Sequence, residues 1–365
     1  MGLKCGIVGL PNVGKSTLFN SLSSARAQSA NFPFCTIEPN VGTISIPDPR
    51  LYKLADLVKP HNIVPNTIEI YDIAGLVKGA SEGEGLGNQF LANIRDVNAI
   101  LHVVRCFEDD NVVHVDGQVD PVSDKEIIDT ELQLRDLDTV EKRLQKLEKQ
   151  SKSGDKKVLH QQELFRGLKS HLEQGKSARS WESAGEDEGL LNELQLLTRK
   201  PVLYVANVDE DSIDSGNPHV EKLREAIQEE QTEILLISAK IESELAEIEE
   251  PRERQDLLAM YGLEEPGVNR LIRAAYHLLD LQTYFTAGEK EVRAWPLPVG
   301  ATAPEAAGVI HTDFQKGFIK AEVISYDDYM HYRSEAAARD AGRVRIEGKQ
   351  YIVQDGDVVH FRFNV

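Results

Sequence analysis

The chain has 365 residues, 28% of them charged and 41% hydrophobic, which fits a globular protein of two or three domains. Its formal net charge of −19 argues against a surface that coats nucleic acid, and no stretch approaches the roughly 18 consecutive apolar residues that cross a bilayer. The three cysteines, Cys5, Cys35 and Cys106, are far apart and lack metal-ligand spacing, which predicts a reduced, cytoplasmic setting. We expect no signal peptide, because the apolar N-terminus is the first strand of a nucleotide site.

The first motif is a phosphate-binding loop, G-x-x-x-x-G-K-[ST], at Gly9–Thr17. An apolar strand precedes the loop and a helical pattern follows it, as the motif requires, which disfavours a chance glycine-rich turn. Gly9 and Gly14 let the backbone fold tightly, so that N–H groups and a helix N-terminus face the phosphates. Lys15 is expected to reach the outer phosphates, and the Ser16 hydroxyl to ligate Mg²⁺. The predicted nucleotide ligands here are Asn12, Val13, Gly14, Lys15, Ser16 and Thr17.

Two further segments are expected to complete the Mg²⁺ site. The proline-containing loop 31–40 carries Thr36, whose hydroxyl suits the Mg²⁺ shell when a γ-phosphate is present. The strand 67–72 ends in Asp72, and an acidic residue at that place usually anchors Mg²⁺ through water. Leu76 stands where Ras-like GTPases carry a water-orienting glutamine. Catalysis must therefore come from another group, or be slow until a partner supplies one.

A candidate for that other group lies farther along the chain. The glycine-rich segment Gly79–Gly87 is predicted to be mobile, and a buried strand at 99–104 follows, in which His102 is interpreted as a satisfied core residue. The next loop carries His114 among several aspartates, and His114 is the candidate for positioning the attacking water or moving its proton. A surface histidine is the alternative that the sequence leaves open. The predicted catalytic residues are His114 and Lys15.

Base recognition is predicted from an apolar strand that ends in Asn-Val-Asp-Glu at 207–210. GTPases of this class use Asn-Lys-x-Asp, whose aspartate accepts hydrogen bonds from guanine N1–H and the 2-amino group. Val208 replaces that lysine and the longer Glu210 replaces the aspartate, whereas the Asn207 amide can pair with the 6-amino/N7 edge of adenine. The pattern therefore favours ATP. A final strand ends in Ser-Ala-Lys, expected to close over the base, and the predicted base-site residues are Asn207, Val208, Glu210, Ser238 and Ala239.

Two other parts of the chain are predicted from their periodicity. Apolar spacing within 128–198 indicates two antiparallel helices packed as a short coiled coil. This hairpin is locally basic, with 12 basic and 8 acidic residues in 131–181, so a solvated helix pair and a probe for ribosomal RNA both stay open. The segment 281–365 reads as a small α+β interaction module of short strands, including a β-hairpin at 351–363 with Asp-Gly at its turn.

Several motifs together resemble the Obg group of translation-factor GTPases: Gly-Leu-Pro-Asn-Val-Gly-Lys-Ser-Thr, Asn-Phe-Pro-Phe-Cys-Thr-Ile, Asp-Ile-Ala-Gly-Leu-Val-Lys-Gly-Ala and Gly-Leu-Gly-Asn-Gln-Phe-Leu. With Asn-Val-Asp-Glu and the insertion, the whole chain resembles the YchF subfamily, the Obg-like ATPases. The resemblance implies an α/β fold. It consists of a P-loop nucleotide-binding domain with a mostly parallel sheet at 1–280, an antiparallel coiled-coil insertion at 128–198, and an α+β β-grasp (TGS) domain at 281–365.

The resemblance also implies ATP preference over GTP, slow hydrolysis, and association with the large ribosomal subunit or the 70S ribosome. The basic hairpin or the TGS domain would then contact ribosomal RNA, and we expect a cytoplasmic monomer with no membrane partner. The family's Asn-x-x-Glu falls on Asn207 and Glu210. The apolar residue that the family carries in place of the glutamine falls on Leu76, and the family's loop histidine falls on His114. Asn12 resembles the asparagine that ligates K⁺ in potassium-activated relatives, so Mg²⁺ and K⁺ are the expected cofactors.

Two other functions remain open from the sequence. One is an Obg-type GTPase, which the overall framework supports. The other is a binding module with negligible turnover, in which the nucleotide only sets the shape and which the leucine at 76 favours.

Overall fold

The computed structural model describes residues 3–29, 41–73, 94–114, 117–150, 155–183, 185–230 and 232–364. The chain divides into two compact units, Met1–Thr43 with Glu69–Leu271, and Ile44–Ile68 with Ile272–Val365. The second unit thus joins a short N-terminal segment to the last quarter of the chain. Among the helices of the described ranges, none is both long and apolar enough to cross a bilayer.

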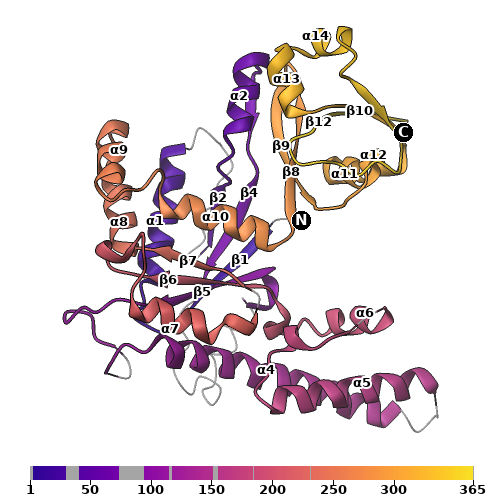
Figure 1. The fold of residues 1–365 in the computed structure, drawn as a ribbon. Coiled ribbons are helices and arrows are strands. Elements are labelled where there is room, and N and C mark those ends of the chain that lie inside the picture. The colour runs from indigo at the N-terminus through magenta and orange to yellow at the C-terminus, as the bar shows by residue number, and fades with distance from the viewer. Residues whose placement is uncertain are drawn as a thin grey trace. The chain divides into compact units, whose positions relative to one another are not determined.

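The first sheet has six strands: β1 (Leu3–Val8), β2 (Val41–Ser45), β4 (Thr67–Asp72), β5 (Ala99–Arg105), β6 (Val202–Asn207) and β7 (Ile234–Ile237). Their order is β2-β4-β1-β5-β6-β7 (Figure 1), and the pairs β1–β5, β5–β6 and β6–β7 are parallel. Every residue of β5 and β6 is buried, as expected for parallel strands covered on both faces. The predicted α/β fold with a mostly parallel sheet is confirmed, and β1, β5, β6 and β7 deliver their carboxyl ends to one edge.

The helices of the first unit connect these strands. They are α1 (Lys15–Ser29), α4 (Pro121–Gln150), α5 (Lys156–Glu173), α6 (Glu186–Glu193), α7 (Pro218–Ala226), α8 (Ala239–Glu247), α9 (Pro251–Met260) and α10 (Gly267–Leu278), which continues into the second unit. Short 3₁₀ turns lie at Ala178–Ser180, Leu197–Arg199, Glu210–Ser212 and Gln228–Glu230.

The helices α4 and α5 lie side by side as a hairpin (Figure 1). The apolar side chains that carry the sequence periodicity form its core: Val140, Leu144 and Leu147 from α4, with Phe165, Leu168 and Leu172 from α5. The expected start of the insertion at residue 128 falls inside α4, which runs unbroken for 30 residues, or about 45 Å. One rigid helix therefore joins the sheet to the hairpin tip.

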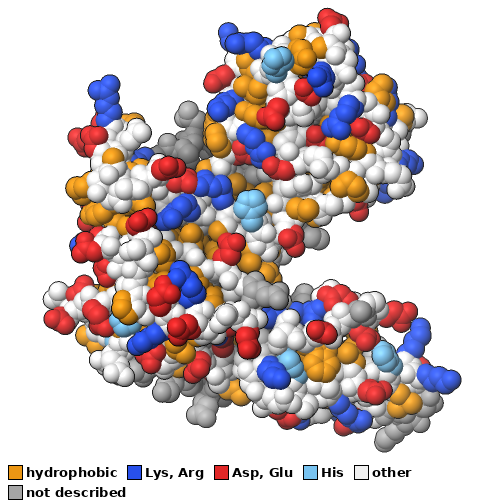
Figure 2. All heavy atoms as spheres, viewed as in Figure 1, with side chains coloured by type: hydrophobic (Ala, Val, Ile, Leu, Met, Phe, Trp, Pro, Cys, Tyr) orange, Lys and Arg blue, Asp and Glu red, His pale blue; other side chains and the backbone are white. Residues whose placement is uncertain are grey.

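Several basic side chains of the hairpin are paired with acidic ones. Lys142 lies 2.6 Å from Asp138, and Lys169 Nζ lies 2.8 Å from Glu141 across the two helices. Figure 2 shows Lys and Arg interspersed with Asp and Glu over the face of the hairpin that it presents. This intermixing favours the solvated helix pair for that face.

The second unit contains a second six-stranded sheet, ordered β11-β10-β12-β8-β9-β3. Its strands are β3 (Asn62–Val64), β8 (Leu281–Ala287), β9 (Glu291–Pro298), β10 (Phe318–Ile324), β11 (Arg345–Glu347) and β12 (Val358–Phe363). Its helices are α2 (Pro49–Val58), α11 (Ala303–Ile310), α12 (Thr312–Lys316), α13 (Tyr326–Tyr332) and α14 (Glu335–Asp340). The strand β3 pairs with β9, so the C-terminal sheet is completed by residues that lie more than 200 positions earlier.

Alternation along the strands gives this sheet two apolar faces, because successive side chains point to opposite sides. Tyr284 belongs to the cluster under α11, whereas the next residue, Phe285, belongs to the cluster under α2 and α13. Val323 and Ile324 divide in the same way. Helices on both faces therefore bury the sheet of the second unit.

The β-hairpin predicted at 351–363 is wrong. β12 pairs with β10 and β8, while Ile352 makes an isolated bridge to Thr302. The Asp-Gly turn instead bonds to β8, since Gly356 N–H donates to the Thr283 carbonyl at 2.8 Å. Long-range pairing of β12 with two strands outweighs the local turn preference.

Candidate nucleotide-binding site

The phosphate-binding loop lies at the carboxyl end of β1 and opens directly into α1, which begins at Lys15. Gly9 and Gly14 have φ angles of 151° and 96°, conformations that side chains rarely adopt. A Cβ on Gly9 would lie 2.4 Å from the Val103 carbonyl oxygen, and one on Gly14 would lie 2.3 Å from Asn207 Nδ2. Both glycines are thus required by close packing as well as by the turn.

The Lys15 ammonium is folded back over this loop. Its Nζ donates to the Leu10 carbonyl at 2.6 Å, and the side chain is buried. Burial lowers the pKa of Lys15 to about 8, while the carboxylate of Asp72 opposes that shift. A phosphate chain at the loop would supply the negative charge that this buried ammonium lacks.

Ser16 and Asp72 lie together, as the sequence predicts for a Mg²⁺ site. The Ser16 hydroxyl donates to Asp72 Oδ2 at 3.3 Å. The other carboxylate oxygen, Oδ1, is buried and has no hydrogen-bond partner among the described residues. Since Mg²⁺ prefers hard oxygen ligands and keeps several waters, a hydroxyl beside a carboxylate with an unpartnered oxygen fits this ion.

The Asn207 side chain links the phosphate-binding loop to the end of β7. Its Nδ2 donates to the Val13 carbonyl at 2.9 Å, and its Oδ1 accepts from Ala239 N–H at 2.9 Å. The residue is only 5% exposed. These bonds give Asn207 a bridging role that sequence reasoning missed, and its pairing with adenine stays a prediction.

The remaining base-site residues meet around the ends of β6 and β7. Glu210 forms an ion pair with Lys240, which holds the pKa of the Glu210 carboxyl below its usual range. Val208 is buried, and its N–H donates to the Ile237 carbonyl at 2.9 Å. Ser238 caps α8 by accepting from Ile241 N–H. The ammonium in this corner thus comes from position 240, and not from the lysine position of Asn-Lys-x-Asp.

The loop that carries His114 is held at several points. The guanidinium of Arg105 donates to the carbonyls of Phe107, Val112 and Asp109 at 2.8–3.2 Å. Asn12 Nδ2 donates to the Val113 carbonyl at 3.1 Å, which ties the loop to the phosphate-binding loop.

His114 itself is buried, so the surface alternative is wrong. Its Nε2 lies 3.1 Å from Asp124 Oδ2, on the first turn of α4, and both side chains are almost inaccessible. Sequence reasoning missed Asp124, because the aspartates noted around His114 lie in the loop itself. Asp124 also precedes the segment 128–198 in which the helices were predicted, so no motif singled it out.

Three predicted features fall outside the described residues: Thr36, Leu76 and the Gly79–Gly87 segment. His102 lies within the described residues and is buried as expected, but its ring is not fully hydrogen-bonded. Its Nε2 has no hydrogen-bond partner within the described ranges, and burial lowers its pKa to about 4. His102 instead packs against Tyr204, with ring centroids 5.3 Å apart.

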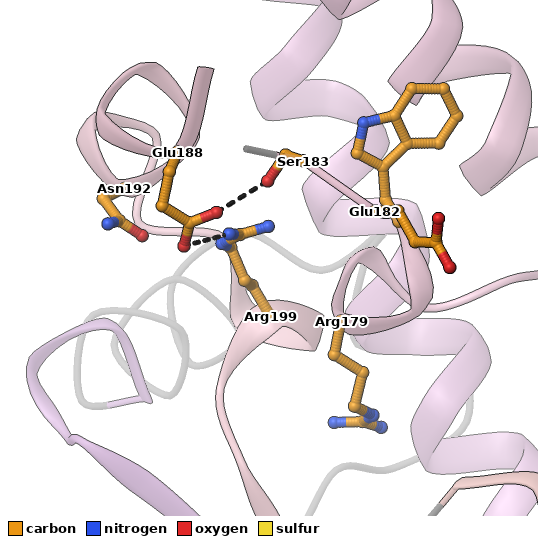
Figure 3. Close-up of a pocket in the computed structure, with 7 residues that line it drawn as sticks. Arg179, Glu182, Ser183, Glu188, Asn192 and Arg199 are labelled. Atoms are coloured by element: carbon orange, nitrogen blue, oxygen red, sulfur yellow. Dashed lines mark hydrogen bonds and ion pairs between the residues drawn. The ribbon is translucent and has the colours of Figure 1, made fainter. Parts of the chain in front are cut away.

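A separate hollow of about 770 Å³ lies beside α6, away from the residues assigned to the nucleotide. Figure 3 shows that Glu188 points at both Ser183 and Arg199, with contacts of 2.6 and 2.5 Å. The Arg179 guanidinium, in the same hollow, donates to the Lys200 carbonyl. These charges are satisfied within the protein, so the hollow has no feature of a phosphate site.

Comparisons with known proteins match the whole chain. The YchF-GTPase_C family model, described as a protein of unknown function, matches residues 281–364, and a model described as 50S ribosome-binding GTPase matches residues 4–150. Proteins named ribosome-binding ATPase YchF from Pasteurella multocida, Haemophilus ducreyi and Bacillus subtilis are 55%, 56% and 55% identical, over 100% of both chains. The chain belongs to the YchF family. A solved structure of the Schizosaccharomyces pombe YchF GTPase is 37% identical, with a TM-score of 0.88 over 99% of this chain and 98% of that one.

The names of these YchF proteins differ in the nucleotide. The curated bacterial relatives are called ATPases, whereas the fission-yeast structure is called a GTPase. The predicted YchF membership is confirmed, and nucleotide hydrolysis by a P-loop domain follows from it. The choice between adenine and guanine therefore depends on the residues around Asn207 and Glu210.

Proposed function

We propose that this protein is a ribosome-associated switch that binds ATP in preference to GTP and hydrolyses it slowly to ADP and phosphate. The observation that carries the choice of base is the ion pair of Glu210 with Lys240 beside the buried Val208. A guanine-reading carboxylate must accept two hydrogen bonds from the base. Here that carboxylate is engaged by an ammonium, so guanine loses its acceptor, whereas adenine lacks the N1–H and 2-amino donors that would need this carboxylate.

The remaining roles follow from the geometry of the loop. Lys15 and the loop N–H groups would bind the phosphates and stabilise the charge that develops on them. Ser16 and Asp72 would hold Mg²⁺, with Thr36 as the proposed third protein group, and the ion would neutralise phosphate charge when bound. His114 would position the attacking water in place of the missing glutamine. ATP-dependent ordering of the loops around Thr36 and Gly79–Gly87 would be the switch.

Asn12 is proposed as a K⁺ ligand as well. Its Nδ2 already donates to the Val113 carbonyl, which leaves the side-chain oxygen as the atom suited to a cation. Hydrolysis at an equal rate in Na⁺ and in K⁺ would contradict this proposal.

The base preference is tested by calorimetric titration of ATP and GTP, side by side, with Mg²⁺ and K⁺ present. We expect ATP to bind about tenfold more tightly or better, a difference of ~1.4 kcal/mol. The double variant Val208→Lys/Glu210→Asp restores the guanine-reading pattern and should shift the preference toward GTP by at least the same factor. Tighter GTP binding by the unaltered protein would refute the ATP assignment and support an Obg-type GTPase.

Lys240→Met is the sharper control, because it changes neither Glu210 nor the backbone that carries it. If the ion pair withholds the carboxylate from guanine, GTP affinity should rise in this variant while ATP affinity stays the same. Unchanged GTP affinity would mean that the ion pair does not set the preference.

Turnover is tested separately from binding. We expect phosphate release to fall strongly in both Lys15→Ala and His114→Ala. If turnover survives both changes, the assigned site is wrong. If the unaltered protein binds ATP but shows no turnover with or without ribosomes, the nucleotide-gated binding module is the better description.

Two findings support the ribosome as the partner: the names of the relatives, and the match of residues 4–150 to the family model described as 50S ribosome-binding GTPase. We further propose a nucleotide-binding domain at 1–280 with the hairpin at 128–198, a TGS domain at 281–365, and a cytoplasmic monomer. Co-sedimentation with 70S ribosomes and with separated subunits, in ATP and in ADP, checks this partner. Absence of the protein from every ribosomal pellet would refute it.

A further inference from the structure

The feature that the proposed function leaves unexplained is the buried contact between His114 and the start of α4. His114 Nε2 and Asp124 Oδ2 are 3.1 Å apart, and their side chains are 6% and 3% exposed. A histidine that only filled space would not require a carboxylate buried beside it, because burying a carboxylate costs free energy unless it is paired.

The start of α4 is built to hold this carboxylate in place. Asp120 caps the helix by accepting from the N–H groups of Val122 and Ser123, and Asp124 N–H donates to the Asp120 carbonyl at 2.9 Å. Asp124 therefore lies in the first helical turn, where the helix dipole favours a negative charge.

The loop on the other side of the contact is fixed independently. The guanidinium of Arg105 holds three of its carbonyls, and Asn12 holds Val113. The backbone next to His114 is thus tied to the phosphate-binding loop, while the imidazole is tied to α4. The bond to Asp124 restrains the orientation of the ring.

We propose that Asp124 is a positioning residue. It orients the imidazole of His114 and affects hydrolysis only through that imidazole. A carboxylate bonded to one ring nitrogen sets the tautomer and the orientation of the imidazole, which decides what the other nitrogen presents to a reacting water. Asp124 touches neither nucleotide nor water in this role. The inference rests on the proposed catalytic function of His114.

This assignment gives α4 a place in the reaction. Asp124 does not belong to the loop of His114, but to the 30-residue helix whose other end forms the hairpin. The orientation of the proposed catalytic imidazole is therefore set by α4 as much as by the nucleotide-binding loops.

The test compares steady-state hydrolysis of ATP in four full-length proteins: unaltered, His114→Ala, Asp124→Ala and His114→Ala/Asp124→Ala. We expect Asp124→Ala to lower kcat about tenfold or more, while KM and the affinity for ATP change less than twofold, because the residue acts only through the imidazole. In the double variant the second change should cost nothing further, since a positioning residue has no effect without its partner.

Two further variants separate positioning from structural damage. Asp124→Asn keeps an acceptor oxygen of the same size and should retain part of the rate that Asp124→Ala loses. Asp136→Ala removes a different buried carboxylate of α4, which accepts from the N–H groups of Leu197 and Thr198, so it should lower the unfolding midpoint and leave kcat unchanged. Calorimetric stoichiometry for ATP gives the folded fraction of each preparation, and rates are expressed per folded molecule.

The outcomes distinguish this inference from the proposed function. No hydrolysis by the unaltered protein, or an unchanged rate in His114→Ala, would overturn the function on which the inference rests. Two outcomes would overturn the role of Asp124 alone, provided that His114→Ala hydrolyses ATP slowly. In the first, Asp124→Ala hydrolyses ATP at an unchanged or higher rate. In the second, the rate losses of the two single variants multiply in the double variant.

Discussion

Replacing Asn207 by alanine separates its observed bridging role from its predicted contact with adenine. The side chain donates to the Val13 carbonyl and accepts from Ala239 N–H, both at 2.9 Å. Alanine removes both bonds and leaves a buried C=O and a buried N–H without partners. Each such group costs about 1–3 kcal/mol, so we expect the free energy of unfolding to fall by about 2–6 kcal/mol.

The two roles predict different nucleotide affinities. If Asn207 mainly holds the phosphate-binding loop against the end of β7, ATP and GTP should weaken by the same factor, because both bind through that loop. If it mainly reads adenine, ATP alone should weaken, by about tenfold or more. Urea unfolding followed by circular dichroism and calorimetric titration of both nucleotides measure the two effects.

Asn66→Ala is the matched control for this experiment. Asn66 is also 5% exposed and donates to Thr283 Oγ1 at 3.2 Å, but it lies in the second unit. It should lower stability without changing either affinity. An Asn207→Ala protein with unchanged unfolding energy and a loss confined to ATP would refute the bridging argument.

Three further predictions follow from the same geometry. Mg²⁺ should raise the affinity for ATP relative to EDTA, and Ser16→Ala should remove most of this increase, because the Ser16 hydroxyl lies beside Asp72 at the proposed Mg²⁺ site. An undiminished increase would exclude Ser16 as a Mg²⁺ ligand. Burial lowers the pKa of Lys15 from 10.5 to about 8, and bound phosphates should raise this pKa again. ATP binding should therefore take up a proton above pH 8 but not at pH 6.5, where Lys15 is already charged. For the same reason the affinity for ATP should fall between pH 8 and 10. Calorimetry in buffers of different ionisation enthalpy measures this uptake, and its absence at pH 9 would contradict the shift. Asp136 accepts from Leu197 N–H, Thr198 N–H and Thr198 Oγ1, each at 2.7 Å, so Asp136→Ala should lower the urea-unfolding free energy by about 3 kcal/mol, and an unchanged midpoint would contradict it.

Local patterns predicted the parts of the site that one short segment builds. The glycine positions of the loop, the strand before it and the helix from Lys15 follow from backbone geometry over a few residues. The proximity of Ser16 to Asp72 was predicted as well, because a strand that ends beside a phosphate-binding loop brings its last residue to the same edge of the sheet. The hairpin core followed from apolar spacing along two helices.

The same local reasoning failed where a distant strand competed. Asp-Gly at 355–356 is a strong turn pattern, but the backbone of β12 pairs with β10 and β8, and Ile352 pairs elsewhere. The short strand β3 was missed altogether, since its partner β9 follows about 230 residues later. Pairing of this kind depends on which edges the rest of the fold leaves open.

The sequence by itself thus determined which chemical groups the chain carries: a phosphate-binding loop, oxygen side chains proposed for Mg²⁺, an altered base-reading motif, and a leucine at the glutamine position with a loop histidine proposed to take over its role. Tertiary structure alone decided which group each of these side chains contacts. Asn207 reaches Val13 across 194 positions, Glu210 meets Lys240, and His114 finds Asp124 on the next helix. The physical reason is that motifs and periodicity act over a few residues, whereas these partners are brought together by the order of strands in the sheet and by the requirement that buried polar groups be paired.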